Sequence, residues 1–487
     1  MIKMNTEIEK NKRILFWDDY YIDSEKTTAQ LCLNHPQKRE IIIRHDEAWE
    51  GDCCAYHNFF RDGDIFRMYY LARDTKTEVI WPIQPGTICY AESKDGIHWK
   101  KPNLGIRNFA ASGTADNNII LDLSDDMFDN FYVFKDENPA CPPEEKYKGV
   151  AVSYLGVKEA GEEVLWCWTS ADGINFKKAW IMTDDGHFDS LNIAFWDKSK
   201  GEYVCYFRGY HFNDEGKQIR DIRYMTSKDF KNWGNANLIE FDSDVEFQLY
   251  TNTVSEYYRA DGIYVGFPVR YTERNVWTEN FDELCNANRR KQMIAEKEPR
   301  AGLALTDGLF MSSHDGKNWH RFDEAFIDAG PERKQNWIYG DCYVARGMIE
   351  TPIDEEDSEE TEISLFVNDG HRSMRPTRLY RHTIRKDGFA CYRAPYSGGD
   401  IVTKPFVLDG TELEINFATS AGGYIRISLL DENDEKIEGC ETCDIIGNST
   451  ERKVKIADKE KLEKLIGKTV CLRFEMKDAM LYSFVIL

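Results

Sequence analysis

The chain has 487 residues, which is more than one compact domain usually contains, so we expect two domains. Its formal net charge of −23 argues against nucleic acid and anionic membranes as partners, because both repel an acidic surface. The first residues lack the apolar core of a secretory signal, no apolar run reaches the roughly 20 residues of a membrane span, and the 13 cysteines are scattered, so we expect a cytoplasmic protein with free thiols and no metal site.

The chain opens with two strand-like segments, 14–23 and 40–44, which are rich in aromatic and β-branched residues. After them a turn motif recurs, Ser-x-Asp with an aromatic residue four positions after the Asp in its first four copies. The Asp of such a hairpin accepts hydrogen bonds from the backbone N–H groups that follow it, and a Gly beside it tolerates positive φ. The five copies are at 93–99, 170–176, 227–233, 313–319 and 385–389.

A second series of Asp turns alternates with the first, so each repeat contains four strands, A to D. Five such units predict a five-bladed β-propeller, with blades at about 46–104, 128–181, 187–240, 247–322 and 337–392. We expect residues 1–45 to complete the ring by pairing with the last blade. The second series of turns contains Asp62, Asp136, Asp197 and Asp261.

The turn motifs stop after Pro395, and residues 396–487 alternate apolar and polar side chains. This alternation predicts a small antiparallel β-sandwich. The expected fold is therefore all-β, with an N-terminal segment 1–45, a propeller domain 46–395 that carries the catalytic site, and a C-terminal sandwich 396–487.

The turn map also predicts which face of the propeller carries chemistry. All the short Asp turns connect strand A to B or C to D, and these connections share one face of the ring. We therefore expect their aspartates to be structural. The opposite face, where A strands begin and B strands end, is the expected site.

A five-bladed propeller whose inner strands open on acidic residues resembles the furanosidase-type propeller glycoside hydrolases of families 32 and 43. Segment 188–196 is similar to their Arg-Asp-Pro strand and puts Asp189 in the place of the aspartate. The C-terminal sandwich is similar to the module appended to invertases. The first blade opens on 49–52 (Trp-Glu-Gly-Asp) rather than on Asn-Asp-Pro-Asn-Gly, and Glu246 is the nearest candidate for the acid.

This resemblance implies hydrolysis by two carboxylates, one protonated as acid and one ionised as base or nucleophile. We expect Glu50 or Asp52 to be the base or nucleophile, Asp189 to orient and tune it, and Glu246 to be the general acid. Asp341, at the start of the last A strand, is a further candidate.

Substrate contacts are expected from the same strand ends. Aromatic residues there offer rings for stacking on a sugar, and arginines offer donors for hydroxyls or a charged group, although core packing accounts for the aromatic residues and the histidine equally well. The candidates are Trp49, His57, Asn192, Arg208, Asn252, Arg270, Trp337, Tyr339 and Arg372.

The sequence leaves three functions open. The first is a glycosidase acting on a small carbohydrate, without a cofactor. The second is a propeller glycoside phosphorylase, in which Arg208, Arg270 or Arg372 holds phosphate. The third is a propeller that binds carbohydrate without turnover.

Overall fold

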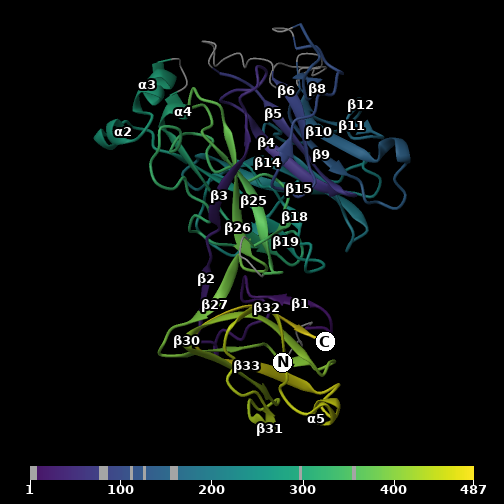
Figure 1. Cartoon of the computed structure of the whole chain (residues 1–487), viewed down its shortest axis with the longest axis vertical. Coiled ribbons are helices and arrows are strands. Elements are labelled where there is room, and N and C mark those ends of the chain that lie inside the picture. Colours follow the sequence, from purple (N-terminus) through teal and green to yellow (C-terminus); the bar gives the residue numbers. More distant parts are fainter. Residues whose placement is uncertain are drawn as a thin grey trace. The chain divides into compact units, whose positions relative to one another are not determined.

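A computed structural model describes residues 8–75, 86–109, 113–123, 128–153, 163–295, 299–353 and 358–487. The chain forms two units (Figure 1). The larger unit contains residues 36–256 and 263–383 and is a five-bladed β-propeller, as predicted. The smaller unit contains residues 1–35, 257–262 and 384–487 and is a β-sandwich. No helix among the described residues is both long and apolar enough to span a bilayer.

Each blade of the propeller is an antiparallel sheet of four strands, some with an added edge strand. The first blade consists of β4 (Ala55–Asp62), β5 (Ile65–Ala72), β6 (Thr87–Ser93) and β7 (Trp99–Lys100), with β8 (Ile119–Asp122) beside β6. The second consists of β9 (Phe128–Lys135), β10 (Tyr147–Ser153), β11 (Val164–Ser170) and β12 (Lys177–Thr183), with the short helix η1 (Pro143–Glu145) before β10. The third consists of β13 (Ile193–Asp197), β14 (Glu202–Phe212), β15 (Gln218–Ser227) and β16 (Asn237–Leu238).

The fourth blade carries the largest insertion. It consists of β18 (Ser255–Glu256), β19 (Tyr264–Gly266), β22 (Met311–Ser313) and β23 (Asn318–Arg321), with β17 (Glu240–Phe241) parallel to β23. Between β19 and β22 the chain forms a two-stranded arm that encloses three helices. These elements are β20 (Val269–Glu273), α2 (Glu279–Glu283), α3 (Ala287–Ala295), α4 (Pro299–Leu303) and β21 (Ala304–Gly308).

The fifth blade closes the ring with a strand from the start of the chain. Its order is β24 (Ile349–Pro352), β25 (Thr361–Asp369), β26 (Arg378–Arg385) and then β3 (Gln37–Arg44). β3 pairs antiparallel with β26, with Arg44 opposite Arg378 and Gln37 opposite Thr383. The N-terminal segment therefore contributes one strand to the propeller, and this strand begins at residue 37.

The sandwich is one bent sheet built on two strands of 18 residues each, β30 (Leu413–Leu430) and β33 (Thr469–Ile486). Their pairing shifts register between Thr419 and Tyr424, which divides the sheet into two halves. Both halves contribute to one core, for example Phe417 from one and Phe474 from the other. The other elements are β1 (Arg13–Leu15), β2 (Gln30–Leu33), β27 (Ala390–Ala394), β28 (Gly399–Val402), β29 (Phe406–Val407), β31 (Lys436–Glu441), β32 (Asn448–Val454) and α5 (Lys459–Glu463).

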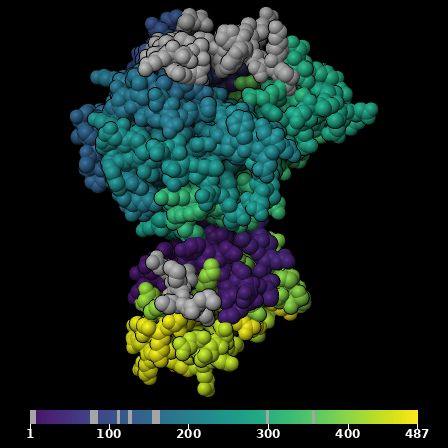
Figure 2. Space-filling view, turned by 180° about the vertical axis from the view of Figure 1, so that it is seen from behind, coloured from purple at the N-terminus to yellow at the C-terminus, as the bar shows by residue number. Residues whose placement is uncertain are grey.

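The domain boundaries differ from those expected at residues 45 and 395. β1 pairs with β33 and β2 pairs with β27, so residues 8–35 belong to the sandwich rather than to the propeller. In the space-filling view, purple N-terminal and yellow C-terminal residues lie together in this unit (Figure 2). Strand alternation in the sequence shows that a segment is half-buried, but it does not show which strand it pairs with.

The Asp turns form as predicted in the first four motif copies. In the first, Asp95 Oδ1 accepts the backbone N–H groups of Ile97 at 2.9 Å and His98 at 2.8 Å, and Gly96 has φ +75°. The fifth copy differs, because Asp387 is buried in the sandwich. There it accepts a hydrogen bond from the Tyr257 hydroxyl and forms ion pairs with Arg13 and Arg259.

Candidate functional site

One side chain from each blade converges where the five inner strands begin. Tyr56 opens β4, Asp129 lies at the start of β9, and Asp189 precedes β13. Tyr250 and Tyr343 precede β18 and β24, and their rings lie 5.9 Å apart. The Tyr56 ring lies 6.0 Å from that of Tyr343, and the charges of Asp129 and Asp189 add to the effect of burial in raising the pKa of Tyr56.

Asp189 is the carboxylate most open to solvent in this group, with 46% of its side chain exposed. Asn130 donates to its Oδ1 at 3.4 Å, and Arg208 Nη2 lies 3.7 Å from its Oδ2. Glu163 Oε2 accepts the backbone N–H of Asp189 at 3.0 Å. Partial burial raises the pKa of Asp189, and the charges on Asp129 and Glu163 raise it further, whereas Arg208 opposes this shift.

Asp129 supplies a second carboxylate at the same place. Its Oδ2 forms an ion pair with Arg73 Nη2 at 3.1 Å, and both side chains are almost buried. Asp129 was not among the residues expected from the sequence, because no candidate was taken from the opening of the second blade. Asp129 lies at the opening of an inner strand, as Asp189 does one blade later, and this position could have identified it as a candidate. We call Tyr56, Arg73, Asp129, Asp189, Arg208, Tyr250, Tyr339, Tyr343 and Arg372 the central site.

Glu50, the first expected base or nucleophile, lies outside the central site. Its side chain is fully buried and accepts hydrogen bonds from Lys101 Nζ and the Tyr70 hydroxyl, both at 2.6 Å. Burial alone would raise the pKa of Glu50, but hydrogen bonding and charge from His45 and Lys101 lower it from 4.5 to about 2. Glu50 is thus a permanently charged group inside the first blade.

Asp52 and Asp341, the other two expected acids of the A-strand openings, bind backbone N–H groups. Asp52 accepts those of Thr75 and Met374, each at 2.9 Å. Asp341 accepts those of Gly370 at 2.8 Å and Ile338 at 3.2 Å, and burial raises its pKa to about 7. Both are buried and hold neighbouring loops in place.

Four expected substrate contacts are also engaged within the protein. Trp49 donates to the Asn118 side chain at 2.8 Å, and the His57 and His45 rings share a hydrogen bond of 2.9 Å. Asn192 donates to the carbonyls of Phe188 and Ser190, and Asn252 accepts the N–H of Val254. We therefore leave them out of the central site.

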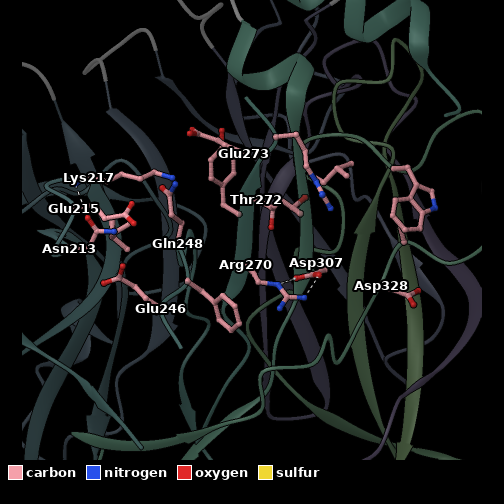
Figure 3. Close-up of a pocket in the computed structure, with 18 residues that line it drawn as sticks. Asn213, Glu215, Lys217, Glu246, Gln248, Arg270, Thr272, Glu273, Asp307 and Asp328 are labelled. Carbon is pink, nitrogen blue, oxygen red and sulfur yellow. Dashed lines mark hydrogen bonds and ion pairs between the residues drawn. The ribbon is translucent and has the colours of Figure 1, made fainter. Parts of the chain in front are cut away.

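A cleft of about 580 Å³ beside β20 collects three more expected residues, Glu246, Arg270 and Trp337 (Figure 3). Glu246 hydrogen-bonds to His211 at 2.8 Å, and Arg270 forms a two-point ion pair with Asp307. The cleft is lined by both acidic and basic side chains.

The cleft adjoins the central site through one tyrosine. Tyr271 lines the cleft, while its ring packs edge-on against Tyr339 with centroids 5.8 Å apart. The expected residues thus fall into two neighbouring groups. Asp189, Arg208, Tyr339 and Arg372 lie at the central site, and Glu246, Arg270 and Trp337 lie in the cleft. Among the described residues no three or more His, Cys, Asp or Glu side chains form a cluster suited to a metal ion.

Comparisons with known proteins find no matching family model and no matching curated protein. Several solved structures are similar in fold. One, described simply as a glycoside hydrolase, is 12% identical, with 72% of this chain and 92% of the other protein covered and a TM-score of 0.45. A GH130 structure, from work on mannoside phosphorylases and glycoside hydrolases, is 13% identical, with coverage of 76% and 96% and a TM-score of 0.42.

A glycosyl hydrolase from Bacteroides ovatus is 11% identical, with 72% of this chain and 94% of the other protein covered and a TM-score of 0.42. Each of these structures is thus only remotely similar to the chain.

Proposed function

We propose that the protein is a glycoside hydrolase that uses Asp189 as the proton donor and Asp129 as the second carboxylate. The observation that carries this proposal is the contrast between the two acids. Asp189 is half-exposed and has a raised pKa, whereas Asp129 is buried against Arg73. Paired carboxyl groups in environments that differ in this way are typical of glycosidases.

The chemistry follows from these two roles. Protonated Asp189 gives its proton to the glycosidic oxygen as the bond from that oxygen to the anomeric carbon breaks, and the alcohol leaves. Positive charge develops on the sugar and is stabilised by the carboxylate of Asp129. Water adds to the anomeric carbon and loses a proton, which restores the acid. The rings of Tyr250 and Tyr339 pack edge-on against each other, with centroids 6.1 Å apart, and belong to the same site.

This assignment changes the roles expected from the sequence. Asp189 was expected to orient a base and is now proposed as the acid. Glu50 and Glu246 are replaced by Asp129 as the second carboxylate, because Glu50 is enclosed and Glu246 lies in the neighbouring cleft.

The substitutions Asp189→Asn and Asp129→Asn test the proposal. Screening para-nitrophenyl glycosides would identify a substrate, and each substitution should then lower kcat/KM by about 10²–10⁴-fold, the usual contribution of acid–base catalysis. Glu246→Gln is the matched control and should retain activity. Retained activity in the Asp189→Asn variant would contradict the assignment.

A second measurement separates a proton donor from a merely structural acid. Glycosides with a good leaving group, such as 2,4-dinitrophenolate, need no protonation of that group. The loss of kcat/KM caused by Asp189→Asn should therefore be smaller on these substrates. The alkaline limb of the pH–rate profile should also disappear in this variant, because the raised pKa of Asp189 sets it. A deficit that is equal for good and poor leaving groups would argue for a structural role.

A propeller that binds carbohydrate without turnover remains the alternative. Its signature would be saturable binding of a sugar that wild-type protein never cleaves, with unchanged affinity in the Asp189→Asn variant.

A further inference from the structure

We propose that the central site, together with Arg220 beside it, binds an anionic group, either phosphate or the carboxylate of an acidic sugar, on the guanidinium groups of Arg208, Arg220 and Arg372. The proposal rests on the function proposed above and specifies the class of its substrate.

Positive charge exceeds negative charge around the aromatic cluster of the central site. Arg73 is paired with Asp129, but Arg208 reaches Asp189 only at 3.7 Å. Arg220 and Arg372 have no carboxylate partner among the described residues. Arg220 donates to the Gln248 amide oxygen, and Arg372 lies beside the Cys53 thiol.

Protonation of Asp189 increases this imbalance. When Asp189 carries its proton as the general acid, Arg208 loses the charge of its ion-pair partner, and of the carboxylates that act on it Glu163 still carries a charge. The acid-competent state of the site is therefore the state with the largest excess of positive charge, and an anion would neutralise it.

Unused hydrogen-bond donors support the same conclusion. The Nε–H groups of Arg208, Arg220 and Arg372 are buried and have no hydrogen-bond partner in the described part of the chain, a state that they share with arginines away from this site such as Arg290, Arg321 and Arg378. A buried donor without a partner costs about 1–3 kcal/mol, and more when it is charged, so an anion that accepts from these three groups would recover that cost.

The three guanidinium groups are held around one cluster of aromatic rings. Arg208 lies 5.8 Å from the Tyr250 ring, Arg220 lies 4.8 Å from that of Tyr271, and Arg372 lies 5.1 Å from that of Tyr339. The tyrosine rings touch one another, with centroids 5.8 to 6.2 Å apart. An arginine stacked on a ring is held in place while its N–H edge stays available for a planar anion.

Arg270, in the neighbouring cleft, is an arginine whose guanidinium donors are paired within the protein. It donates to both oxygens of Asp307, at 2.9 and 2.6 Å, and to the carbonyl of Asp323 at 2.8 Å. Its donors are satisfied by the protein, so it provides a matched control for the other three.

Two sources could supply the anion. Inorganic phosphate would act as co-substrate, so that the glycosidic C–O bond breaks, a phosphate oxygen bonds to the anomeric carbon, and the proton of Asp189 goes to the leaving alcohol. An acidic sugar would instead bring its carboxylate as part of the substrate, and water would be the nucleophile. Both anions fit the fork of an arginine.

Titration calorimetry with inorganic phosphate, glucuronate and the neutral methyl glucoside tests the proposal on the whole wild-type protein. At least one anion should bind, and it should bind more weakly as salt is raised. Arg372→Met and Arg208→Met should weaken it roughly tenfold or more, in line with the loss of a charged hydrogen bond, whereas Arg270→Met should not. If neither anion binds wild-type protein better than the neutral glucoside, the proposal is wrong.

The Asp189→Asn variant separates this proposal from the proposed hydrolysis. It removes a competing negative charge, so it should bind the anion at least as tightly as wild type while losing turnover. Anion binding that disappears with Asp189→Asn would overturn the proposal. Turnover that requires phosphate and releases a sugar phosphate would identify phosphate as the anion, and cleavage restricted to uronic acid glycosides would identify the carboxylate.

Discussion

Glu50 and Asp189 show how environment sets the role of a carboxylate. Both precede the first residue of an inner strand, and both were expected to take part in catalysis. Glu50 is enclosed by Lys101, Tyr70 and His45, whereas Asp189 is half-exposed beside negative charges. The pKa of Glu50 is therefore lowered and that of Asp189 is raised. Sequence position placed both residues at the same end of the ring, but it did not reveal which side chain is buried among partners.

The buried charge of Glu50 should contribute to the free energy of unfolding in a pH-dependent way. Burial lowers the pKa of His45, so near pH 7 Lys101 supplies the positive charge beside Glu50, and His45 adds its charge only at lower pH. Because the folded pKa of Glu50 is about 2 and its ordinary value is 4.5, its contribution is complete above about pH 4.5 and is lost as pH falls toward 2. Glu50→Gln should lower the free energy of unfolding by about 3 kcal/mol near pH 7.

Urea denaturation near pH 7 and near pH 3 measures this effect. The difference between wild type and the Glu50→Gln variant should shrink by about half at the lower pH. Where it is folded, the Glu50→Gln variant should have a kcat/KM within a few-fold of wild type. A loss of activity as large as that of Asp189→Asn would return Glu50 to the catalytic residues.

At the scale of elements, the sequence predicted the blades well because each Asp turn is local. The turn at Asp95 depends on residues within three positions, so a short motif identifies it. Strand pairing between the chain ends depends on distant partners, and neither the β1–β33 nor the β2–β27 pair has a local signal. For the same reason the motif at 385–389 was read as a blade turn although Asp387 is buried in the sandwich.

Asp341, in the loop before β24, should make the free energy of unfolding depend on pH. The ordinary pKa of 3.8 is raised to about 7 in the folded protein, so ionisation of Asp341 opposes folding. The penalty is absent below about pH 4, grows as pH rises, and is complete above about pH 7, where it reaches about 4 kcal/mol.

Asp341→Asn does not titrate and so isolates this effect. The unfolding free energy of wild type minus that of the variant should fall as pH rises from about 4 to about 7.5. A difference that stays constant across this range would show that Asp341 does not titrate there in the folded protein.

At the scale of the whole molecule, each unit is assembled from separate pieces of chain. The sandwich takes residues 1–35, 257–262 and 384–487, so it cannot be removed as one continuous segment. The sequence predicted both architectures, but it assigned residues 8–35 to the wrong unit, because a half-buried strand fits either sheet equally well.

Truncation tests this division. Deleting residues 384–487 alone removes β33 and β27 and leaves β1 and β2 without their partners, including the buried Ile14 and Phe16. Exposed apolar strands of this kind promote aggregation. Deleting residues 1–35 together with 384–487 removes both sides of the pairing, and this variant should give more soluble protein than the single deletion. The measurement is the soluble fraction of each deletion variant after expression. Equal soluble fractions would argue against the assignment of residues 8–35 to the sandwich.

The closure of the propeller by β3 has a consequence for synthesis on the ribosome. β3 is made early, yet Arg39 in it bonds to Thr383, which lies 344 positions later. At about 5–20 residues per second, β3 waits roughly 20–70 s for its partner strand. During that time its edge is open to wrong partners, so the nascent chain should need a holding chaperone until the ring can shut.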